Sequence, residues 1–477
     1  MGILGYSSPQ FELPGDEFES RVTEPPPSSA WLAPSATGPL SARVELPGSK
    51  SLTNRELVLS ALADGPSTLI APLRSRDSSL MVDALQQLGV AINPVPGTDR
   101  GNGPDLTITP SELGGGISVD CGLAGTLMRF LPPLAALALG PVTFVGDASA
   151  SRRPMKTTID SLRALGVDVS DDGRGTLPFT VHGMGRVEGG ELEIDASASS
   201  QFVSGLLLAA ARFEQGLTLR HTGEHLPSLP HIEMTIDVLK ARGVDVSSPE
   251  TGVWVVAPGP IAGRRVVIEP DLSNAGPFLA AALVAGGSVS VPRWPEATTQ
   301  VGDELRALLA GFGAEVTRVG DALKVDGREG VFGGRTYAGA ELDLSSGGEL
   351  APTIAALCAF AAGPSRITGI GHLRGHETDR LAALSAELTA LGCQVTELED
   401  GLAIRPGPMQ ATERTWRAYE DHRMATAGAI IGLGVPGIIV DDITTTAKTM
   451  PDFPKLWQQM LGRGTTGAYT PALTVPE

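Results

Sequence analysis

Six short polar segments recur along the chain, each at the start of a run rich in Ala, Gly and Leu. They are LPGSKSLTNR (46–55), GLAGTLMR (122–129), SASSQF (197–202), DLSNAG (271–276), ELAPT (349–353) and YEDHRMA (419–425). Ser, Thr and Asp are preferred helix N-caps, which explains Ser199 and Asp421. Capping does not explain Lys50, Arg55 and Arg423, because cations near a helix N-terminus oppose the helix dipole. A bound anion, shared by backbone N–H groups and these side chains, would reconcile both facts.

Further cations stand in polar loops or at helix starts. They are Arg152 and Arg153 in SRRPMK (151–156), Arg374 and Arg380 in LRGHETDR (373–380), and Lys448 in TTTAKTMPD (444–452). For each of them a solvated surface position is the alternative. The pair His376 and Glu377 suggests zinc, but Arg380 stands where the HExxH motif requires histidine. A glutamate among cations can instead transfer a proton.

Two alternating series of helices are expected to position these segments. The first is apolar almost all round, so it belongs inside a core. Its members start near Thr53, Gly125, Ser199, Ser273, Glu349 and Asp421, at spacings of 72 to 76 residues. The second is amphipathic and covers the outside. Its members lie in 83–92, 160–169, 236–246, 305–316 and 384–395, with a shorter sixth member in 453–462.

Apolar runs bounded by turn signals predict strands between these helices. They are RVELPG, LTITP, VTFVGD, LTLRHTG, WVVAPG and RVVIEP. Each repeat is therefore a strand–helix–strand–helix–strand unit of an α/β protein. Six such units could stack linearly or form two domains of three, and the repeat pattern does not choose between these arrangements.

Composition sets the outer limits. The chain has 477 residues, 42% of them hydrophobic and 19% charged, as in a globular protein of two to four domains. The net charge of −18 argues against nucleic acid or an anionic membrane as a general partner.

The acidic N-terminus lacks a signal core, so we expect a cytoplasmic protein. The three cysteines are far apart, which predicts neither disulfides nor a zinc site. Residues 1–40 and 463–477 are expected to be a loosely attached arm and tail.

Seven of the segments resemble, in order and spacing, the signatures of 5-enolpyruvylshikimate-3-phosphate synthases. They are LPGSKSLTNR, GLAGTLMR, SRRP, SASSQF, GHETDR, DHRMA and TTAKTMPD. The resemblance runs from about residue 42 to residue 461. It implies an enolpyruvyl transferase that joins phosphoenolpyruvate to the 5-hydroxyl of shikimate 3-phosphate and releases phosphate, on the route to chorismate and the aromatic amino acids. No metal or organic cofactor is implied.

The resemblance also implies an architecture. Each of two domains is an inside-out α/β barrel of three βαβαββ units related by pseudo-threefold symmetry. The first domain comprises residues 41–48 and 270–462, and the second comprises residues 49–269. The active site would lie in the cleft between them and close on substrate. A monomer is the expected state.

The resemblance assigns site residues by position. The catalytic candidates are Lys50, Glu349 and Glu377, with Glu377 as proton donor to the phosphoenolpyruvate methylene carbon. The shikimate 3-phosphate candidates are Lys50, Ser51, Arg55, Ser199, Ser200, Ser228, Glu349 and His376. The phosphoenolpyruvate candidates are Lys50, Gly125, Arg153, Gln201, Arg380, Arg423 and Lys448. The reaction is addition followed by elimination through a tetrahedral ketal.

The chain departs from the family pattern mostly on the shikimate side. His376 replaces a common Lys, Glu349 a common Asp, Leu123 a common Asn, His231 a common aromatic residue and His372 a common Asn. The phosphoenolpyruvate side matches the family. Gly125 is the small residue typical of glyphosate-sensitive members, which implies inhibition by glyphosate in competition with phosphoenolpyruvate.

The sequence disfavours two alternative functions. The related transferase that acts on UDP-N-acetylglucosamine usually has a reactive Cys before its Arg-Pro pair, whereas GDASASRRP (146–154) has none. Its entry motif also has Asn where this chain has Ser51. A non-catalytic repeat scaffold would have lost some of the functional residues, but Lys50, Arg153, Glu377 and Lys448 are all present.

Overall fold

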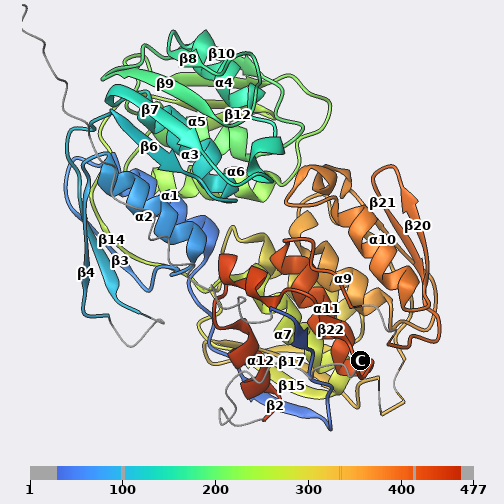
Figure 1. Cartoon of the computed structure of the whole chain (residues 1–477). Coiled ribbons are helices and arrows are strands. Elements are labelled where there is room, and N and C mark those ends of the chain that lie inside the picture. The colour runs from blue at the N-terminus through green and yellow to red at the C-terminus, as the bar shows by residue number, and fades with distance from the viewer. Residues whose placement is uncertain (1–28, 98–102, 332, 335, 412–414, 463–477) are drawn as a thin grey trace, which may run out of the picture.

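The computed structural model describes residues 29–97, 103–331, 333–334, 336–411 and 415–462. Their buried apolar side chains form two separate cores, and each core defines one lobe in Figure 1. The upper lobe has its core between Leu57 and Ile261. The lower lobe combines core residues Trp31 to Leu46 with Leu272 to Met460. Among the described residues, no helix is long and apolar enough to span a bilayer.

Six helices lie inside the lobes with nearly every residue buried. They are α1 (Lys50–Ala61), α3 (Gly125–Ala135), α5 (Gln201–Ala210), α7 (Leu272–Ala285), α9 (Ala351–Cys358) and α11 (His422–Gly434). Small residues let these helices approach closely. A Cβ on Gly205 of α5 would lie 2.1 Å from the carbonyl oxygen of Arg129 in α3, so only glycine fits at this crossing.

The amphipathic helices cover the inner set, and short 3₁₀ turns complete the chain. The helices are α2 (Arg76–Gln87), α4 (Lys156–Ala164), α6 (Leu229–Lys240), α8 (Leu305–Gly311), α10 (Arg380–Ala390) and α12 (Phe453–Met460). The 3₁₀ turns are η1 (Ala150–Arg152), η2 (Val301–Glu304), η3 (Gly348–Leu350), η4 (Gly371–Gly375) and η5 (Ile443–Lys448). The predicted alternation of buried and amphipathic helices is therefore confirmed, although the buried helices start up to three residues from the predicted positions.

The described strands form five four-stranded mixed sheets, each with one parallel pair followed by two antiparallel pairs. Three sheets lie in the upper lobe. Their strand orders are β14 (Arg265–Val267), β3 (Ser67–Ile70), β5 (Asp105–Thr109), β4 (Ala91–Val95); β6 (Ile117–Asp120), β7 (Leu139–Val145), β9 (Phe179–Met184), β8 (Asp168–Ser170); and β10 (Gly190–Ile194), β11 (Leu217–His221), β13 (Val253–Val256), β12 (Val246–Glu250).

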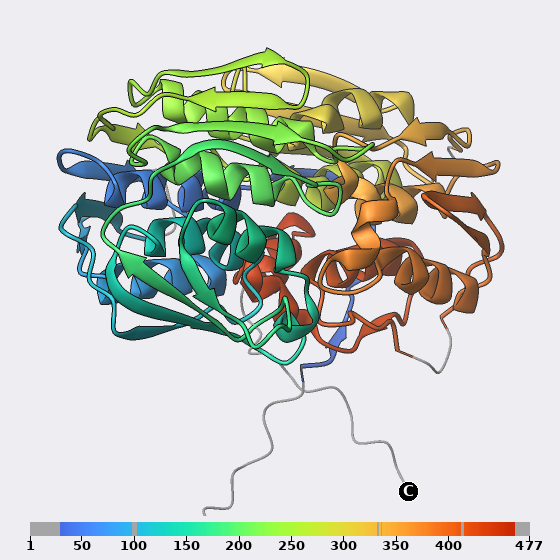
Figure 2. The ribbon, with the colours of Figure 1, turned by 90° about the horizontal axis from the view of Figure 1, so that it is seen from above.

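The lower lobe repeats this pattern and adds one strand pair. Its sheets are β2 (Leu40–Arg43), β15 (Gly287–Val291), β17 (Ala322–Arg328), β16 (Glu315–Val319); β18 (Glu341–Asp343), β19 (Ser365–Thr368), β21 (Gly401–Arg405), β20 (Gln394–Leu398); and the pair β1 (Trp31–Leu32) with β22 (Ile439–Val440). Seen from above, the sheets lie outside and the helices run between them (Figure 2). The chain is thus an α/β protein built from repeated small mixed sheets.

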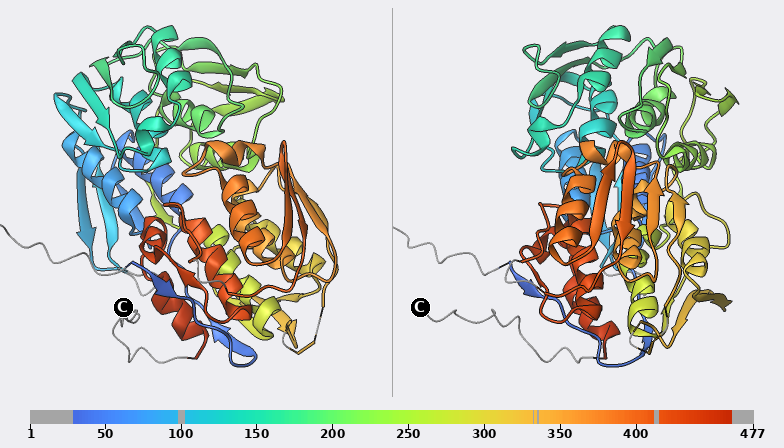
Figure 3. Two further views of the ribbon diagram at one scale, coloured as in Figure 1. Left: turned by 45° about the vertical axis from the view of Figure 1, so that its right-hand side comes forward. Right: turned by 90° about the vertical axis from the view of Figure 1, so that its right-hand side faces the viewer.

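The chain passes between the lobes at two adjacent points. The N–H of Ser49 donates to the carbonyl of Glu269 at 2.8 Å, and the N–H of Asp271 donates to the carbonyl of Pro47 at 2.9 Å. Strand β2 precedes the first crossing and pairs with β15, and strand β14 precedes the second and pairs with β3. Both partners are far away in sequence. Figure 3 shows the resulting two lobes with β1 and β2 beside the C-terminal elements.

Two predictions about local structure are wrong. The arm does not extend to residue 40, because Trp31 is buried, β1 pairs with β22, and β2 begins at Leu40. This segment has too few apolar residues to show a period, and its order comes from the tertiary partner. The run RVELPG is a strand only at its first residue, since β2 ends at Arg43 where the chain turns toward the upper lobe. Residues 1–28 and 463–477 lie outside the described residues.

Candidate active site

All six buried helices start beside one cavity between the lobes. The lining residues from these starts are Ser49, Lys50, Ser51, Gly125, Thr126, Ser199, Gln201, Asp271, Ser273, Glu349, His422 and Arg423. The polar segments at the six helix starts therefore come together at one place in the structure. Asp271 caps α7 and also accepts the backbone N–H of Lys50 at 3.1 Å, so one carboxylate ties together the starts of two helices in different lobes.

The lining of the cavity is strongly cationic. It includes Lys50, Arg129, Arg153, Arg380, Arg423 and Lys448. Helix α3 begins here at Gly125 without a side-chain cap. A Cβ on Gly125 would lie 3.0 Å from a terminal nitrogen of both Arg129 and Arg153. The Nε atoms of both arginines are buried and have no hydrogen-bond partner. This corner has the donors and charge to bind a phosphate or carboxylate.

Glu377 lies among these cations. Its carboxylate contacts the ammonium group of Lys448, and its Oε2 lies 3.2 Å from Nη2 of Arg380. Burial by itself would raise the pKa of Glu377. The charges of Lys448, Arg380 and Arg153 outweigh burial and hold that pKa well below its ordinary value. Glu377 is therefore ionised near pH 7.

Glu349 provides the second carboxylate of the cavity. Its Oε1 accepts a hydrogen bond from Ser273 and lies 3.5 Å from Nη2 of Arg423. Its Oε2 lies 3.3 Å from Nε2 of His231, which belongs to the upper lobe. Burial opposes ionisation, but these neighbours hold the pKa of Glu349 at about 2. Glu349 thus presents a fixed negative charge to the cavity.

Lys50 lines the cavity at the start of α1, and its charge interacts with both carboxylates. Its Nζ is 4.0 Å from a carboxylate oxygen of Asp77, whose side chain is buried. Burial lowers the pKa of Lys50 below its ordinary value, and Asp77 opposes this shift. A lysine in such a setting can give up and regain a proton more readily than one in water.

The structure brings twelve of the predicted site residues to the cavity and leaves three outside it. Those at the cavity are Lys50, Ser51, Gly125, Arg153, Ser199, Gln201, Glu349, His376, Glu377, Arg380, Arg423 and Lys448. Ser200 and Ser228 do not line it. Arg55 is 1% exposed, and its guanidinium is bonded to protein groups, including the carbonyl of Ser51 at 3.0 Å. Arg55 therefore supports the cavity wall from behind.

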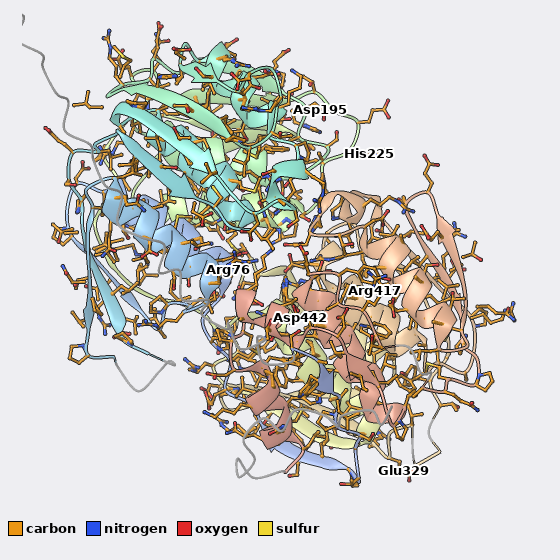
Figure 4. The ribbon with its side chains drawn as sticks, viewed as in Figure 1. Arg76, Asp195, His225, Glu329, Arg417 and Asp442 are labelled. Atoms are coloured by element: carbon orange, nitrogen blue, oxygen red, sulfur yellow. The ribbon has the colours of Figure 1, made fainter. Side chains whose placement is uncertain are left out.

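Two cations considered as anion ligands also lie elsewhere. Arg152 lines a neighbouring cavity together with Arg76 of the upper lobe and Asp442 of the lower lobe, which are labelled in Figure 4. Arg374 pairs with Asp379 and Glu397, each at 3.0 Å. Both arginines are thus part of the surrounding surface, the alternative that the sequence had left open.

Several lining residues were not singled out from sequence. They include Arg129, Asp271, Gln300, His422 and Thr449. Arg129 had a signal, since it follows Gly125 by one helical turn and so shares its face. His422 stands inside DHRMA, and both of its ring nitrogens are buried without a hydrogen-bond partner. Burial and then the charge of Arg423 lower the pKa of His422 well below its ordinary value.

The departures from the family pattern differ in their position. His376 and His231 line the cavity. His372 does not, and instead packs so closely that a Cβ on Gly348 would lie 2.7 Å from its ring. Leu123 acts through its backbone, because its carbonyl accepts from Arg153 at 3.3 Å and from Lys448 at 3.4 Å. A change of side chain at 123 therefore leaves this contact in place.

Comparisons with known proteins agree with this geometry. The protein family described as EPSP synthase (3-phosphoshikimate 1-carboxyvinyltransferase) matches residues 34–457. A 3-phosphoshikimate 1-carboxyvinyltransferase from Kocuria rhizophila is 57% identical over 442 residues, covering 91% of this chain and 96% of the relative.

Solved structures give the same fold at lower identity. An EPSP synthase from Acinetobacter baumannii superposes with a TM-score of 0.73 at 24% identity, covering 90% of this chain and 98% of that one. The enolpyruvyl transferase NikO from Streptomyces tendae superposes with a TM-score of 0.71 at 18% identity, covering 91% and 98%. At these identities the likeness shows the fold alone.

Proposed function

The chain belongs to the EPSP synthase family and is a 3-phosphoshikimate 1-carboxyvinyltransferase, and from this premise we propose how the groups of the cleft divide the reaction. The enzyme transfers the enolpyruvyl group of phosphoenolpyruvate to the 5-hydroxyl of shikimate 3-phosphate, within aromatic amino acid biosynthesis. We assign each substrate to a part of the cavity and name the groups that transfer protons. The observation that carries it is the corner where Gly125 meets Arg129 and Arg153, whose buried Nε atoms have no hydrogen-bond partner.

Phosphoenolpyruvate binds at the cationic corner. Its proposed ligands are Lys50, Gly125, Arg153, Gln201, Arg380, Arg423 and Lys448, with Arg129 added because it borders Gly125. Phosphoenolpyruvate carries a phosphate and a carboxylate, so two anionic groups need several donors at once. Arginine forks suit both groups, and the uncapped start of α3 adds backbone N–H donors.

Shikimate 3-phosphate binds next to phosphoenolpyruvate in the same cavity. The proposed ligands are Lys50, Ser51, Ser199, Ser200, Ser228, Glu349 and His376, with Arg55 as a supporting residue behind Ser51. Glu349 suits the substrate hydroxyls, because an ionised carboxylate accepts hydrogen bonds from them. Ser200 and Ser228 stay in this proposed set although they do not line the cavity in this structure. Arg55 has a supporting role instead. Its guanidinium already has protein partners, so Arg55 acts by holding the Ser51 and His231 segments in place.

The chemistry is an addition followed by an elimination. A proton adds to the methylene carbon of phosphoenolpyruvate, and the oxygen of the 5-hydroxyl bonds to the neighbouring carbon as that hydroxyl loses its proton. The product of this step is a tetrahedral ketal. The C–O bond to phosphate then breaks, a proton leaves the methyl group, and the enol ether double bond forms. Glu377, Lys50 and Glu349 are the proposed proton-transfer groups.

The two cores support the proposed division into one domain of residues 41–48 plus 270–462 and another of residues 49–269. The sheet and helix repeats are compatible with two barrels of three βαβαββ units. A monomer as the active form stays a prediction. A cytoplasmic location stays a prediction.

Phosphate release from phosphoenolpyruvate tests the substrate assignment. We expect release with shikimate 3-phosphate and none with UDP-N-acetylglucosamine in a parallel reaction. Shikimate 3-phosphate is the smaller acceptor. Carboxylates of the cavity can accept hydrogen bonds from its hydroxyls, and the serines can donate to its phosphate. Release only with the nucleotide sugar would contradict the proposed acceptor side, and release with neither would contradict the proposed chemistry.

The substitution Gly125→Ala tests the phosphoenolpyruvate corner. The added Cβ would lie 3.0 Å from Arg129 and Arg153 nitrogens, so both guanidinium groups must shift. We expect the KM for phosphoenolpyruvate to rise roughly tenfold, the equivalent of about 1.4 kcal/mol. Glyphosate, which we expect to compete with phosphoenolpyruvate, should lose inhibition in the same variant.

The matched control is Gly259→Ala, because a Cβ there meets no atom within 4 Å. Its kinetic constants should equal those of the wild type. An unchanged KM in Gly125→Ala would move phosphoenolpyruvate away from this corner. A glyphosate inhibition constant that does not depend on phosphoenolpyruvate concentration would refute competition.

A further inference from the structure

The first turn of α6 reaches across the cleft from the upper lobe to the lower lobe. Nε2 of His231 lies 3.3 Å from Oε2 of Glu349, and the N–H of Ser228 donates to the carbonyl of Ser345 at 3.2 Å. The two contacts are three residues apart on one side and four on the other. They therefore bring one short segment of each lobe together at the cavity.

The backbone of His231 is held firmly. Its carbonyl accepts hydrogen bonds from Nη2 of Arg55 at 2.8 Å and from Oγ1 of Thr235 at 3.0 Å. Arg55 is itself enclosed, with its Nε bonded to Thr235 at 2.8 Å. A buried charged donor on the carbonyl fixes where the imidazole starts. The His231 side chain is 16% exposed, so it lies against the cavity without being sealed from it.

The two oxygens of Glu349 have different partners. Oε1 is held from within the lower lobe by Ser273 and Arg423. Oε2 meets His231, which is the contact that the described part of the upper lobe supplies. Without His231 the carboxylate would be restrained at one oxygen and could rotate about its last bond.

We propose that His231 is a positioning residue that sets the direction of the Glu349 carboxylate when the lobes close. His231 acts through Glu349 and does not take part in proton transfer. The acceptor hydroxyls then meet a carboxylate restrained at both oxygens, which lowers the cost of ordering substrate. The inference rests on the proposed binding of shikimate 3-phosphate at Glu349.

The surrounding charges explain why histidine suits this position. The charged groups that act on His231 are Glu349, Arg55, Lys50 and Arg423. Three of these are cations, so another permanent positive charge would be unfavourable. Burial lowers the pKa of His231, which leaves the imidazole neutral near pH 7 and able to donate one N–H. A neutral donor can contact the carboxylate without adding to the cationic crowding.

The first experiment measures kcat and both KM values for His231→Ala and His231→Gln. We expect His231→Ala to raise the KM for shikimate 3-phosphate about tenfold, within the range of coupling between neighbouring residues. The KM for phosphoenolpyruvate should stay near the wild-type value. His231→Gln keeps a side-chain N–H and should recover most of the affinity. Equal increases in both KM values would overturn the proposal, because they would mean a general loosening of the cleft.

The matched control is His225→Ala. His225 is exposed and lies on the segment that leads into α6, where Figure 4 labels it. Its replacement should leave both KM values unchanged. Thermal unfolding of each variant checks the fold, and His231→Gln keeps the comparison valid if the alanine variant is unstable.

A double-mutant cycle with Glu349→Gln separates this inference from the proposed site. If His231 acts through Glu349, His231→Ala should add little to the KM increase already caused by Glu349→Gln. Fully additive effects would overturn the positioning role while leaving Glu349 as a substrate ligand. An unchanged KM for shikimate 3-phosphate in Glu349→Gln alone would overturn the proposed substrate placement, and the inference with it.

Discussion

Lys50→Ala is expected to lower the turnover number at least about 100-fold, the scale of losing one transition-state donor. The Lys50 side chain lines the cavity and interacts electrostatically with both Glu377 and Glu349, where the two substrates would meet. It is the cavity lysine whose pKa burial lowers, with Asp77 at 4.0 Å as its partner. Removing it deletes both a charge at the junction of two anions and a group able to transfer a proton.

Steady-state phosphate release with saturating substrates measures this effect. Lys50→Arg keeps the charge but hardly releases a proton, so it separates the two roles. If proton transfer matters, Lys50→Arg stays as slow as Lys50→Ala, and if charge suffices, much of the rate returns. The exposed Lys240 at the end of α6 is the control, and Lys240→Ala should be unaffected. A near-wild-type rate for Lys50→Ala would refute the role of this lysine.

Glu377→Gln is expected to lower kcat about 10²- to 10⁴-fold, the usual contribution of a general acid or base. Glu377 is ionised near pH 7, because Lys448, Arg380 and Arg153 hold its pKa well below the ordinary value. Bound phosphoenolpyruvate would share those cations and so raise the pKa of Glu377. The carboxyl group could then take up a proton and deliver it to the methylene carbon. Glutamine keeps the shape of the side chain but cannot do this.

The check is kcat together with the KM for phosphoenolpyruvate. We expect kcat to fall much further than the KM rises, since glutamine leaves the cationic ligands in place. Glu397→Gln is the matched control, because Glu397 pairs with Arg374 at 3.0 Å on the surface. A loss confined to the KM would contradict proton transfer and would leave Glu377 with an electrostatic role only.

The sequence allowed most of the architecture to be predicted because its signals are local. Helices such as α7 and α11 show their burial in an unbroken apolar composition, and the even spacing of their starts shows the repeat. The positions of Lys50, Arg153 and Lys448 followed from motif order. The segment around Trp31 was missed, since a two-residue strand has no period of its own and depends on β22.

The repeat, the helix types and the residue types at each helix start can all be predicted from the amino-acid sequence. Which of those residues face the cavity depends on how the chain packs. Arg55 is an example. Its motif suggested an anion ligand, but in the folded protein its guanidinium donates hydrogen bonds to His231, Thr235 and Ser51. The contact between His231 and Glu349 likewise joins residues from different lobes. Spacing along a helix reports its faces, but a contact between lobes depends on how two separately folded cores come together.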